Sequence, residues 1–369
     1  MSVFAGNFGK KLKITLFGGS HQPHIGVTIE GLPDGVSIDM QHIEWMLERR
    51  RPGKSALSTA RNEPDKPIVT AGLRDGATFG QPLSIIIENT DVRKRDYRDF
   101  YDTPRPAHAD YTARLKYGND LPMSGGGPFS GRMTAPLCIA GAIAAQALEA
   151  HGVFIGAHIF SIGAVKDEAL DATQITKNIL AQIQEKPFPV CSDAAGQRMQ
   201  AEILTAKKDG DSVGGVVECY ALGFPPGIGG PLAEGVESAL APILFGIPAV
   251  KAVEFGAGLG ASLMRGSAHN DPFYADKADG HAIKTTTNHH GGILGGITSG
   301  MPIVVRAGFK PTPSIAIAQD TVRLSTGQAE KLTIAGRHDP CVVPRAVPVV
   351  ESAVAIGLLD LLLCQPYGL

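Results

Sequence analysis

The chain has 369 residues, 43% of them hydrophobic, and its 34 basic and 36 acidic side chains leave a net charge of −2. That composition is globular and holds enough apolar surface for a core, while the near-neutral charge gives no argument for binding nucleic acid or an anionic membrane. The longest apolar stretch, residues 135–150, is too short to span a bilayer, and the N-terminus lacks the apolar core of a signal peptide.

The five cysteines indicate a reducing compartment. Their number is odd, and the sequence contains no C-x-x-C pair and no H-E-x-x-H pattern. We therefore expect neither a disulfide framework nor a metal site, and we expect the protein to be cytoplasmic.

Short strands and one helix are predicted at the start of the chain. Residues 11–30 favour two strands around a Gly and His turn, because β-branched residues alternate with glycine breaks. Asp39 is a candidate N-cap for a helix over residues 40–51, which Pro52-Gly53 ends. Residues 82–88 have the continuous apolar character of a buried strand.

A long polar loop separates this region from the rest of the chain. Regular periodicity fades from 89 to 124, and a loop of that length is uncommon in a compact domain unless it is functional. Further helices are predicted over residues 131–150, 168–186, 192–208 and 348–363, and further strands over 213–222, 249–255, 303–308 and 331–335.

One segment recurs within the sequence. GLPDGV at 31–36 and GFPPGI at 223–228 share the spacing G-x-P-x-G-apolar, and each is predicted to join a strand to a helix. The pattern indicates either a duplicated strand–turn–helix unit, near 27–51 and 217–246, or coincidence in a chain rich in Gly and Pro. Duplication favours a single large pseudo-symmetric domain over residues 1–369, and no linker-like segment divides the chain.

Basic residues are concentrated between residues 45 and 116, where 14 Lys and Arg face ten acids. The run RRRPG at 49–53 places three guanidinium groups at a predicted helix end. They either complement the helix dipole or recognise phosphate and carboxylate groups, and the sequence leaves both interpretations open.

Three further motifs carry candidate chemistry. Gly125–Gly127 precede a predicted helix, which is typical of an anion site but also of a hinge. His21 follows Ser20, and His108 lies between Arg105 and Asp110, so both suit proton transfer to an anionic ligand. In Arg337-His338-Asp339 the carboxylate is either a structural ion-pair partner or a general base.

Taken in order, these segments resemble the chorismate synthase family over nearly the whole chain. The matching segments are F-G-x-S-H at 17–21, RRRPG at 49–53, IENTD at 87–91, PRPAHADYT at 104–112, KYG at 116–118, GGG at 125–127, VEFGAG at 253–258, NHHGGILGGITSG at 288–300, KPTPSI at 310–315 and GRHDPCVVPRAVPVVE at 336–351. Each segment alone is a weak signal, but ten in the same order are specific to this family.

The resemblance implies a fold, a reaction and partners. The fold is α+β, a β-α-β sandwich, assembled as a homotetramer. The reaction is the anti-1,4-elimination of phosphate from 5-enolpyruvylshikimate 3-phosphate to give chorismate, a carbon–oxygen lyase reaction that requires reduced FMN. The flavin is reduced either by an intrinsic NADPH-dependent activity or by an outside source.

The resemblance also implies roles for individual residues. His21 matches the histidine that protonates the departing phosphate, His108 the one that protonates the reduced flavin, and Asp339 the aspartate that helps to remove the C6 proton. The substrate and phosphate positions are Ser20, Arg50, Arg105, Arg132 and Arg337, and the FMN positions are Ser130, Ala249, Gly295, Lys310, Pro311, Thr312, Pro313, Ser314 and Arg337.

The chain departs from the family pattern at three places. Gly19 and Gln22 stand where the family has Glu and Gly, and Ala56 stands where it has an arginine soon after RRRPG. Ser124, Pro128 and Phe129 stand where it has two arginines and a serine. These losses leave an alternative: a diverged member that binds flavin or a phosphorylated ligand without lyase activity. Phe129 either stacks on the flavin ring or packs beneath its loop, and we favour packing.

Overall fold

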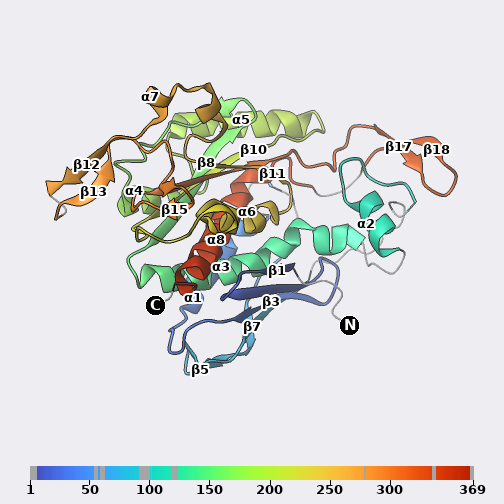
Figure 1. Cartoon of the computed structure of the whole chain (residues 1–369). Coiled ribbons are helices and arrows are strands. Elements are labelled where there is room, and N and C mark those ends of the chain that lie inside the picture. Colours follow the sequence, from blue (N-terminus) through green and yellow to red (C-terminus); the bar gives the residue numbers. More distant parts are fainter. Residues whose placement is uncertain are drawn as a thin grey trace.

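The computed structural model describes residues 6–53, 57–58, 63–90, 100, 102–118, 124–277, 280–334 and 338–365. Within these ranges, two five-stranded antiparallel sheets enclose a layer of helices (Figure 1). This is the predicted α+β sandwich.

The first sheet has the strand order β1-β2-β3-β7-β4 and the second the order β11-β16-β10-β8-β9. The strands of the first sheet are β1 (Gly6–Phe8), β2 (Lys13–Gly18), β3 (His24–Glu30), β7 (Leu83–Glu88) and β4 (Ile68–Ala71). Those of the second are β11 (Val250–Phe255), β16 (Ile303–Phe309), β10 (Gly215–Leu222), β8 (Phe154–Ile162) and β9 (Val165–Lys166).

The helices between the sheets are α1 (Met40–Arg50), α3 (Thr134–Glu149), α6 (Val236–Phe245) and α8 (Val343–Leu363). Two further helices pack against the β8–β9 end of the second sheet, α4 (Lys177–Gln184) and α5 (Asp193–Lys208). Smaller elements complete the chain: β5 (Leu73–Arg74), β6 (Ala77–Thr78), α2 (Asp110–Tyr117), η3 (Ser124–Phe129), η4 (Gly131–Met133), η5 (Leu232–Glu234), η6 (Gly258–Leu263), α7 (Gly266–His269), β12 (Phe273–Asp276), β13 (Ala282–Thr285), β14 (Ile293–Leu294), β15 (Ile297–Thr298), β17 (Gln319–Arg323) and β18 (Gln328–Leu332).

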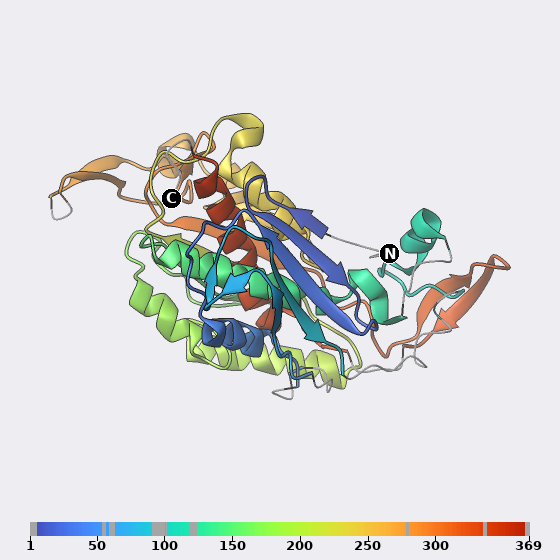
Figure 2. The same cartoon turned by 90° about the horizontal axis from the view of Figure 1, so that it is seen from below.

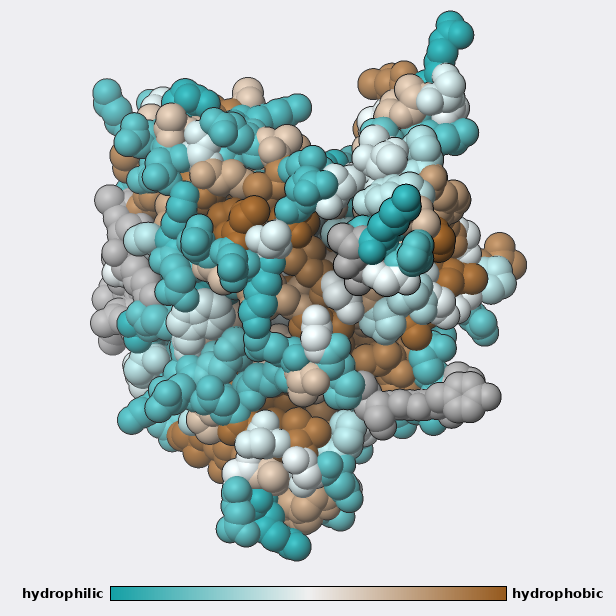
Figure 3. Space-filling view, turned by 90° about the vertical axis from the view of Figure 1, so that its left-hand side faces the viewer, coloured by the Kyte–Doolittle hydropathy of each residue, from teal (hydrophilic) through white to brown (hydrophobic). Residues whose placement is uncertain are grey.

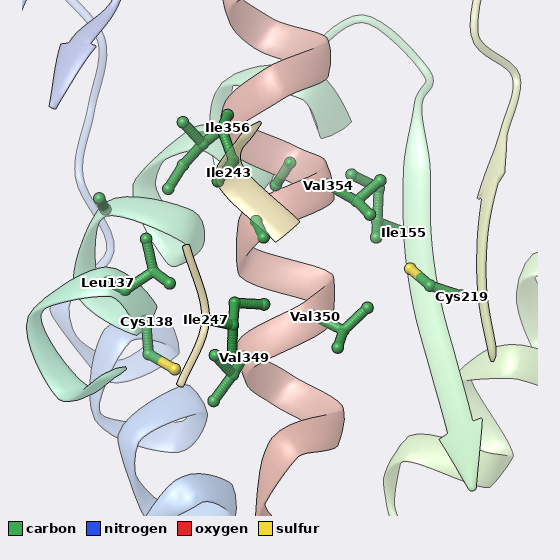
Figure 4. Close-up of a cluster of buried hydrophobic side chains, with 14 of the residues drawn as sticks. Leu137, Cys138, Ile155, Cys219, Ile243, Ile247, Val349, Val350, Val354 and Ile356 are labelled. Atoms are coloured by element: carbon green, nitrogen blue, oxygen red, sulfur yellow. The ribbon is translucent and has the colours of Figure 1, made fainter. Parts of the chain in front are cut away.

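The core forms around α8, which is apolar on all sides. Val350 and Val354 point toward Ile155 and Cys219 of the second sheet, while Val349 points toward α3 (Figure 4). Helix α8 is also long and apolar enough to cross a membrane, but 89% of its most apolar 18-residue stretch is buried inside the fold. It is therefore a core helix, and one continuous buried cluster contains residues of both sheets.

The repeated segments occupy corresponding places in the two halves. GLPDGV links β3, the middle strand of the first sheet, to α1, and GFPPGI follows β10, the middle strand of the second, ahead of α6. Duplication and the single-domain assignment stay predictions, which this correspondence and the continuous core support.

Four sequence predictions need correction. The segment from 89 to 124 contains a helix, α2, and the helix predicted over 168–186 is confined to α4, where the Thr176 side chain caps the first turn. The strand predicted over 331–335 lies earlier, at β18. Helix α8 begins at Val343 and not near 348, because a proline is tolerated in a first turn whose N–H groups have no helical partner.

Helices α3 and α8 approach each other so closely that only glycine fits at position 141. A Cβ atom on Gly141 would lie 2.1 Å from the Ser352 Cβ and 2.3 Å from its Cα. Overpacking a core in this way costs about 1–3 kcal/mol.

We therefore expect Gly141→Ala to lower the free energy of unfolding by about 1–3 kcal/mol, measured by denaturant titration. Gly266→Ala is the matched control, because a Cβ there meets no atom within 4 Å. Equal stability of the two variants would contradict the close packing of α3 on α8.

Candidate functional site

A cavity of about 600 Å³ is formed where several distant segments of the chain meet. Its walls come from the turn before β3, the end of α1, residues 105–109, residues 128–134, residues 245–251, residues 309–314 and the start of α8. The volume is within the usual range of small-molecule pockets, about 300–1,000 Å³.

Most of the sequence-predicted site residues line this cavity: His21, Arg50, Arg105, His108, Ser130, Arg132, Ala249, Lys310, Thr312, Pro313, Ser314 and Asp339. Three described residues do not. Ser20 is buried behind His21, Pro311 does not reach the cavity wall, and Gly295 lies in the turn between β14 and β15. Arg337 lies outside the described residues.

Two of the cavity arginines share one buried carboxylate. Asp65 accepts a hydrogen bond from Arg50 Nη1 at 3.1 Å with one oxygen and pairs with Arg132 Nη1 through the other. All three side chains are at most 2% exposed. Asp65 has φ +50°, an uncommon conformation for a non-glycine residue, so the backbone adopts a strained state where the carboxylate is placed.

The IENT segment fixes Arg132 to the turn that carries His21. Asn89 accepts from Arg132 Nε at 3.0 Å, and its amide donates to the carbonyl groups of Gly19 and Gln22 at 3.1 and 2.7 Å. Thr90 donates through its backbone N–H and its hydroxyl to Glu63, whose carboxylate lies 3.9 Å from Arg132 Nη2. The motif therefore positions one cation of the cavity relative to one histidine.

Both clamped arginines keep a donor without a partner. Among the described residues, Arg50 Nε and Arg132 Nη2 are buried and make no hydrogen bond. Burial, together with the neighbouring Arg345 and Arg132, lowers the pKa of Arg50 to about 10, against the opposing effect of Asp65. Arg50 thus remains charged at neutral pH, and a bound anion would compensate both the charge and the missing hydrogen bonds.

His108 is held by an arginine–carboxylate pair. Arg105 donates to both oxygens of Asp110 at 2.7 Å, and His108 Nδ1 lies 3.1 Å from Arg105 Nη2 and 3.1 Å from Asp110. Burial alone would raise the pKa of Asp110, but the hydrogen bonds from Arg105 and His108 outweigh it and keep this pKa well below its usual value. The imidazole is oriented through Nδ1 beside a permanent negative charge.

The glycine loop approaches this histidine. Gly126 has φ +93°, a backbone conformation that favours glycine, and a Cβ atom there would lie only 3.3 Å from His108 Cε1. Both the backbone conformation and the short distance therefore favour glycine at this position. The carbonyl of Gly127 accepts the N–H of Ser20 at 3.4 Å, and the Ser20 hydroxyl lies 3.0 Å from His21 Nδ1. The loop therefore packs against both histidine segments.

Asp339 is ion-paired and still lines the cavity. Its carboxylate pairs with Arg345 Nη1, and Arg345 Nε donates to the Arg50 carbonyl at 3.0 Å. Desolvation, with Arg105 and His108 nearby, lowers the pKa of the adjacent His338, which favours its neutral form. The two interpretations left open for Asp339 are thus compatible, since the ion pair holds a charged carboxylate at the cavity wall.

Two lysines, Lys251 and Lys310, and the buried hydroxyl of Thr312 also line the cavity. Lys310 Nζ donates to the Ala107 carbonyl at 3.1 Å, and burial together with Lys251 lowers the Lys310 pKa. Thr312 Oγ1 is buried without a hydrogen-bond partner in the described chain. A lysine beside an unpaired hydroxyl suits a phosphate or another oxyanion.

Phe129 is not packed beneath its loop, so that prediction is wrong. The side chain lines the cavity and is 38% exposed, with Tyr117 beside it at 6.5 Å between ring centroids. An aromatic face at the cavity wall is available to a planar ligand.

The three arginines of RRRPG have three different roles. Arg50 reaches the cavity, Arg49 forms a bidentate pair with the buried Glu351 at 2.5 and 2.9 Å, and Arg51 pairs with Glu48 at the surface. Arg49 and Arg51 are thus held in ion pairs, whereas ligand recognition by Arg50, the member of the run that lines the cavity, stays a prediction.

Sequence reasoning missed four residues of the site or its support: Glu63, Asp65, Lys251 and Arg345. For Glu63 and Asp65, the only indication in the sequence of a role in the site was their position between runs of basic residues. Arg345 falls within a matched motif, but nothing in its neighbours indicated that it would pair with Asp339.

Together, the fold and the cavity define an enzyme that binds a small, multiply charged anion among arginines, lysines and histidines. A sequence model of the chorismate synthase family matches residues 12–363. Chorismate synthases of Pyrococcus abyssi and Thermococcus kodakarensis are 47% and 46% identical over 96% of this chain and 97% of theirs. A crystal structure of chorismate synthase superposes with a TM-score of 0.77 at 26% identity, covering 98% of this chain and 94% of the other. The chain belongs to the chorismate synthase family, a family of lyases, as its motifs predicted.

Asp65→Asn tests the arginine clamp. Removing one partner of a buried ion pair leaves uncompensated charge, so we expect the free energy of unfolding to fall by about 3–5 kcal/mol. We also expect inorganic phosphate to raise the melting temperature of the variant more than that of the wild type, because phosphate can replace the lost carboxylate. Asp320→Asn, which removes an exposed ion pair with Lys331, is the control. It should change neither the free energy of unfolding nor the effect of phosphate on the melting temperature. Wild-type stability in Asp65→Asn would contradict the clamp.

Proposed function

We propose that the chain converts 5-enolpyruvylshikimate 3-phosphate to chorismate and inorganic phosphate by anti-1,4-elimination, with reduced FMN as cofactor. The observation that carries the proposal is the convergence of six cationic side chains, three histidines and two carboxylates on a single cavity. The cations are Arg50, Arg105, Arg132, Lys251, Lys310 and Arg345. The substrate carries one phosphate and two carboxylates, and each charge-assisted hydrogen bond to them contributes about 1.5–3 kcal/mol.

The residues present fit a flavin with a phosphate tail. Ser130, Ala249, Lys310, Thr312, Pro313 and Ser314 would hold it, and the support is the exposed Phe129 ring and the Thr312 hydroxyl, which has no hydrogen-bond partner among the described residues. When bound, reduced FMN supplies electron density to the breaking carbon–oxygen bond.

The acid–base roles follow from the contacts of each group. His21, oriented by Ser20, donates a proton to the departing phosphate. His108, held through Nδ1 by Arg105 and Asp110, keeps a proton beside the flavin position. Asp339 accepts the C6 proton, and its ion pair with Arg345 holds the carboxylate at the cavity wall.

The alternative is a family member that binds these ligands without eliminating phosphate. It is favoured by the residues at 124, 128 and 129, where the family pattern has two arginines and a serine. Lys251, Lys310 and Arg345 line the same cavity and supply positive charge there, so we favour the lyase. We also propose a cytoplasmic location, which the five free thiols support.

Three substitutions separate these possibilities. His21→Ala, His108→Ala and Asp339→Asn should each lower turnover by about 10²–10⁴-fold, the usual contribution of a positioned acid or base, while thermal melts stay close to the wild type. His24→Ala is the matched control, because this exposed histidine at the start of β3 does not line the cavity. Full activity in any one of the three variants would exclude the role given to that residue.

We further propose that the chain forms a homotetramer. The described part of the polar segment from 89 to 124 is supported within the chain. Thr321 Oγ1 donates to the Pro104 carbonyl at 2.7 Å, and Thr103 bonds to Glu330 at 3.1 Å. Figure 2 shows α2 beside this β17–β18 hairpin.

Exposed apolar side chains give the proposal better support. Leu232, Leu259 and Leu263 are 75–93% exposed, and Phe273 and Ile283 on the β12–β13 arm are 66% and 62% exposed. Figure 3, viewed from the side of this arm, shows apolar surface between hydrophilic protrusions. Side chains of this kind gain stability when a second subunit covers them.

Light scattering should therefore give a mass near four times 38.7 kDa. Phe273→Asp combined with Ile283→Asp should reduce that mass, because charge on the arm opposes burial. Leu204→Asp, an exposed leucine on α5, is the control and should leave the mass unchanged. A monomeric wild type that turns over substrate would contradict the tetramer.

A further inference from the structure

We infer that the chain holds a second ligand site, a zinc-type divalent cation site formed by His158, Asp167 and Cys191. None of these residues lines the cavity described above. His158 lies in β8 on the outer face of the second sheet, because its neighbours Ala157 and Ile159 belong to the core on the inner face. Asp167 directly follows β9, and Cys191 comes two residues before α5.

The three potential ligand atoms already converge on one point. His158 Nδ1 lies 3.1 Å from Asp167 Oδ2 and 3.4 Å from Cys191 Sγ, and all three atoms are within 4.8 Å of one another. A tetrahedral zinc ion with bonds of about 2.0–2.3 Å separates its ligand atoms by roughly 3.3–3.7 Å. The two distances from the imidazole therefore need to change by only a few tenths of an ångström.

A second layer of contacts fixes the imidazole for this role. His158 Nε2 lies 3.0 Å from Glu218, whose carboxylate also accepts the Tyr220 hydroxyl at 2.5 Å and Arg306 Nε at 2.6 Å. With Nε2–H donated to Glu218, Nδ1 presents its lone pair to the point that Asp167 and Cys191 share. This carboxylate–histidine arrangement is the usual support of a metal-bound histidine.

The other ligands are also held in place. Asp167 Oδ1 accepts the N–H groups of Glu168 and Ser192 at 2.9 and 3.0 Å, so the carboxylate does not rotate freely. The side chains of His158 and Asp167 are fully buried, and Cys191 is partly exposed, which gives a cation a route to the site.

Charge and ligand chemistry select the cation. The Asp167 carboxylate and a Cys191 thiolate balance two positive charges, so a divalent cation leaves no net charge on the three ligands. A set of one sulfur, one imidazole nitrogen and one carboxylate oxygen suits Zn²⁺ better than Mg²⁺ or Ca²⁺, which prefer oxygen alone. Three protein ligands leave the fourth tetrahedral position to solvent.

No sequence motif indicated this site, because its ligands come from three separate elements at positions 158, 167 and 191. The expectation of no metal site rested on the absence of short ligand spacings. The same groups can also form a hydrogen-bonded network without a metal, and the experiment below separates the two.

The test is metal binding by the full-length chain after treatment with a chelator. Zn²⁺ is titrated and bound metal counted, and Co²⁺ is used as a spectroscopic probe whose thiolate ligation gives a sulfur-to-metal charge-transfer band. We expect one Zn²⁺ per chain and a tetrahedral Co²⁺ spectrum with that band. Glu218→Gln should weaken binding by about 10–100-fold, the usual effect of losing an outer-shell partner.

Cys191→Ser should lose the charge-transfer band and more affinity than Glu218→Gln. Because Cys191 is partly exposed and ends a loop, this variant should fold, which circular dichroism checks. Cys364→Ser, another partly buried free thiol far from the cluster in sequence, is the control and should bind as the wild type does. Substoichiometric binding by the wild type, or unchanged binding and spectrum in Cys191→Ser, would overturn the site. Phosphate-releasing activity is not part of the readout, so failure here is distinct from failure of the proposed function.

Discussion

Repulsion between the cations of the cavity must be compensated before any ligand arrives, and Asp65 is the group that does this for Arg50 and Arg132. One buried carboxylate with an uncommon backbone conformation holds two guanidinium groups at the same wall. Among the described residues, Arg50 Nε and Arg132 Nη2 are buried without a hydrogen bond, so the hydrogen-bonding capacity of the two arginines is not fully used. In the proposed function, a ligand phosphate or carboxylate would complete the arrangement.

The fold serves this cluster by bringing distant parts of the chain to one place. Helix α1 delivers Arg50 from the first sheet, β16 leads into the segment that contains Lys310, and the start of α8 supplies Asp339 and Arg345. Arg345 donates to the carbonyl of Arg50, so the first and last helices of the core are joined at the cavity itself. Gly141 on α3 permits the close packing of α8 at Ser352.

The sequence predicted the sandwich, the main strands and most cavity residues, because ten motifs in order identify the family and its residue roles. It did not predict what holds those residues. Asp65 lies 15 positions from Arg50 and 67 from Arg132, so no local pattern connects them. Phe129 was predicted to be packed because loop aromatics usually are, whereas its ring lines the cavity. The cluster at His158 escaped prediction for the same reason as Asp65: only the paired strands bring its members together.

Phosphate release from 5-enolpyruvylshikimate 3-phosphate by the purified full-length chain, followed under anaerobic conditions, tests the central claim most directly. The account predicts repeated turnover with chemically reduced FMN, and none with oxidised FMN or without flavin. If substrate and reduced FMN bind together but no phosphate is released, the cavity is a binding site only, and the assignment of His21, His108 and Asp339 to catalysis is wrong.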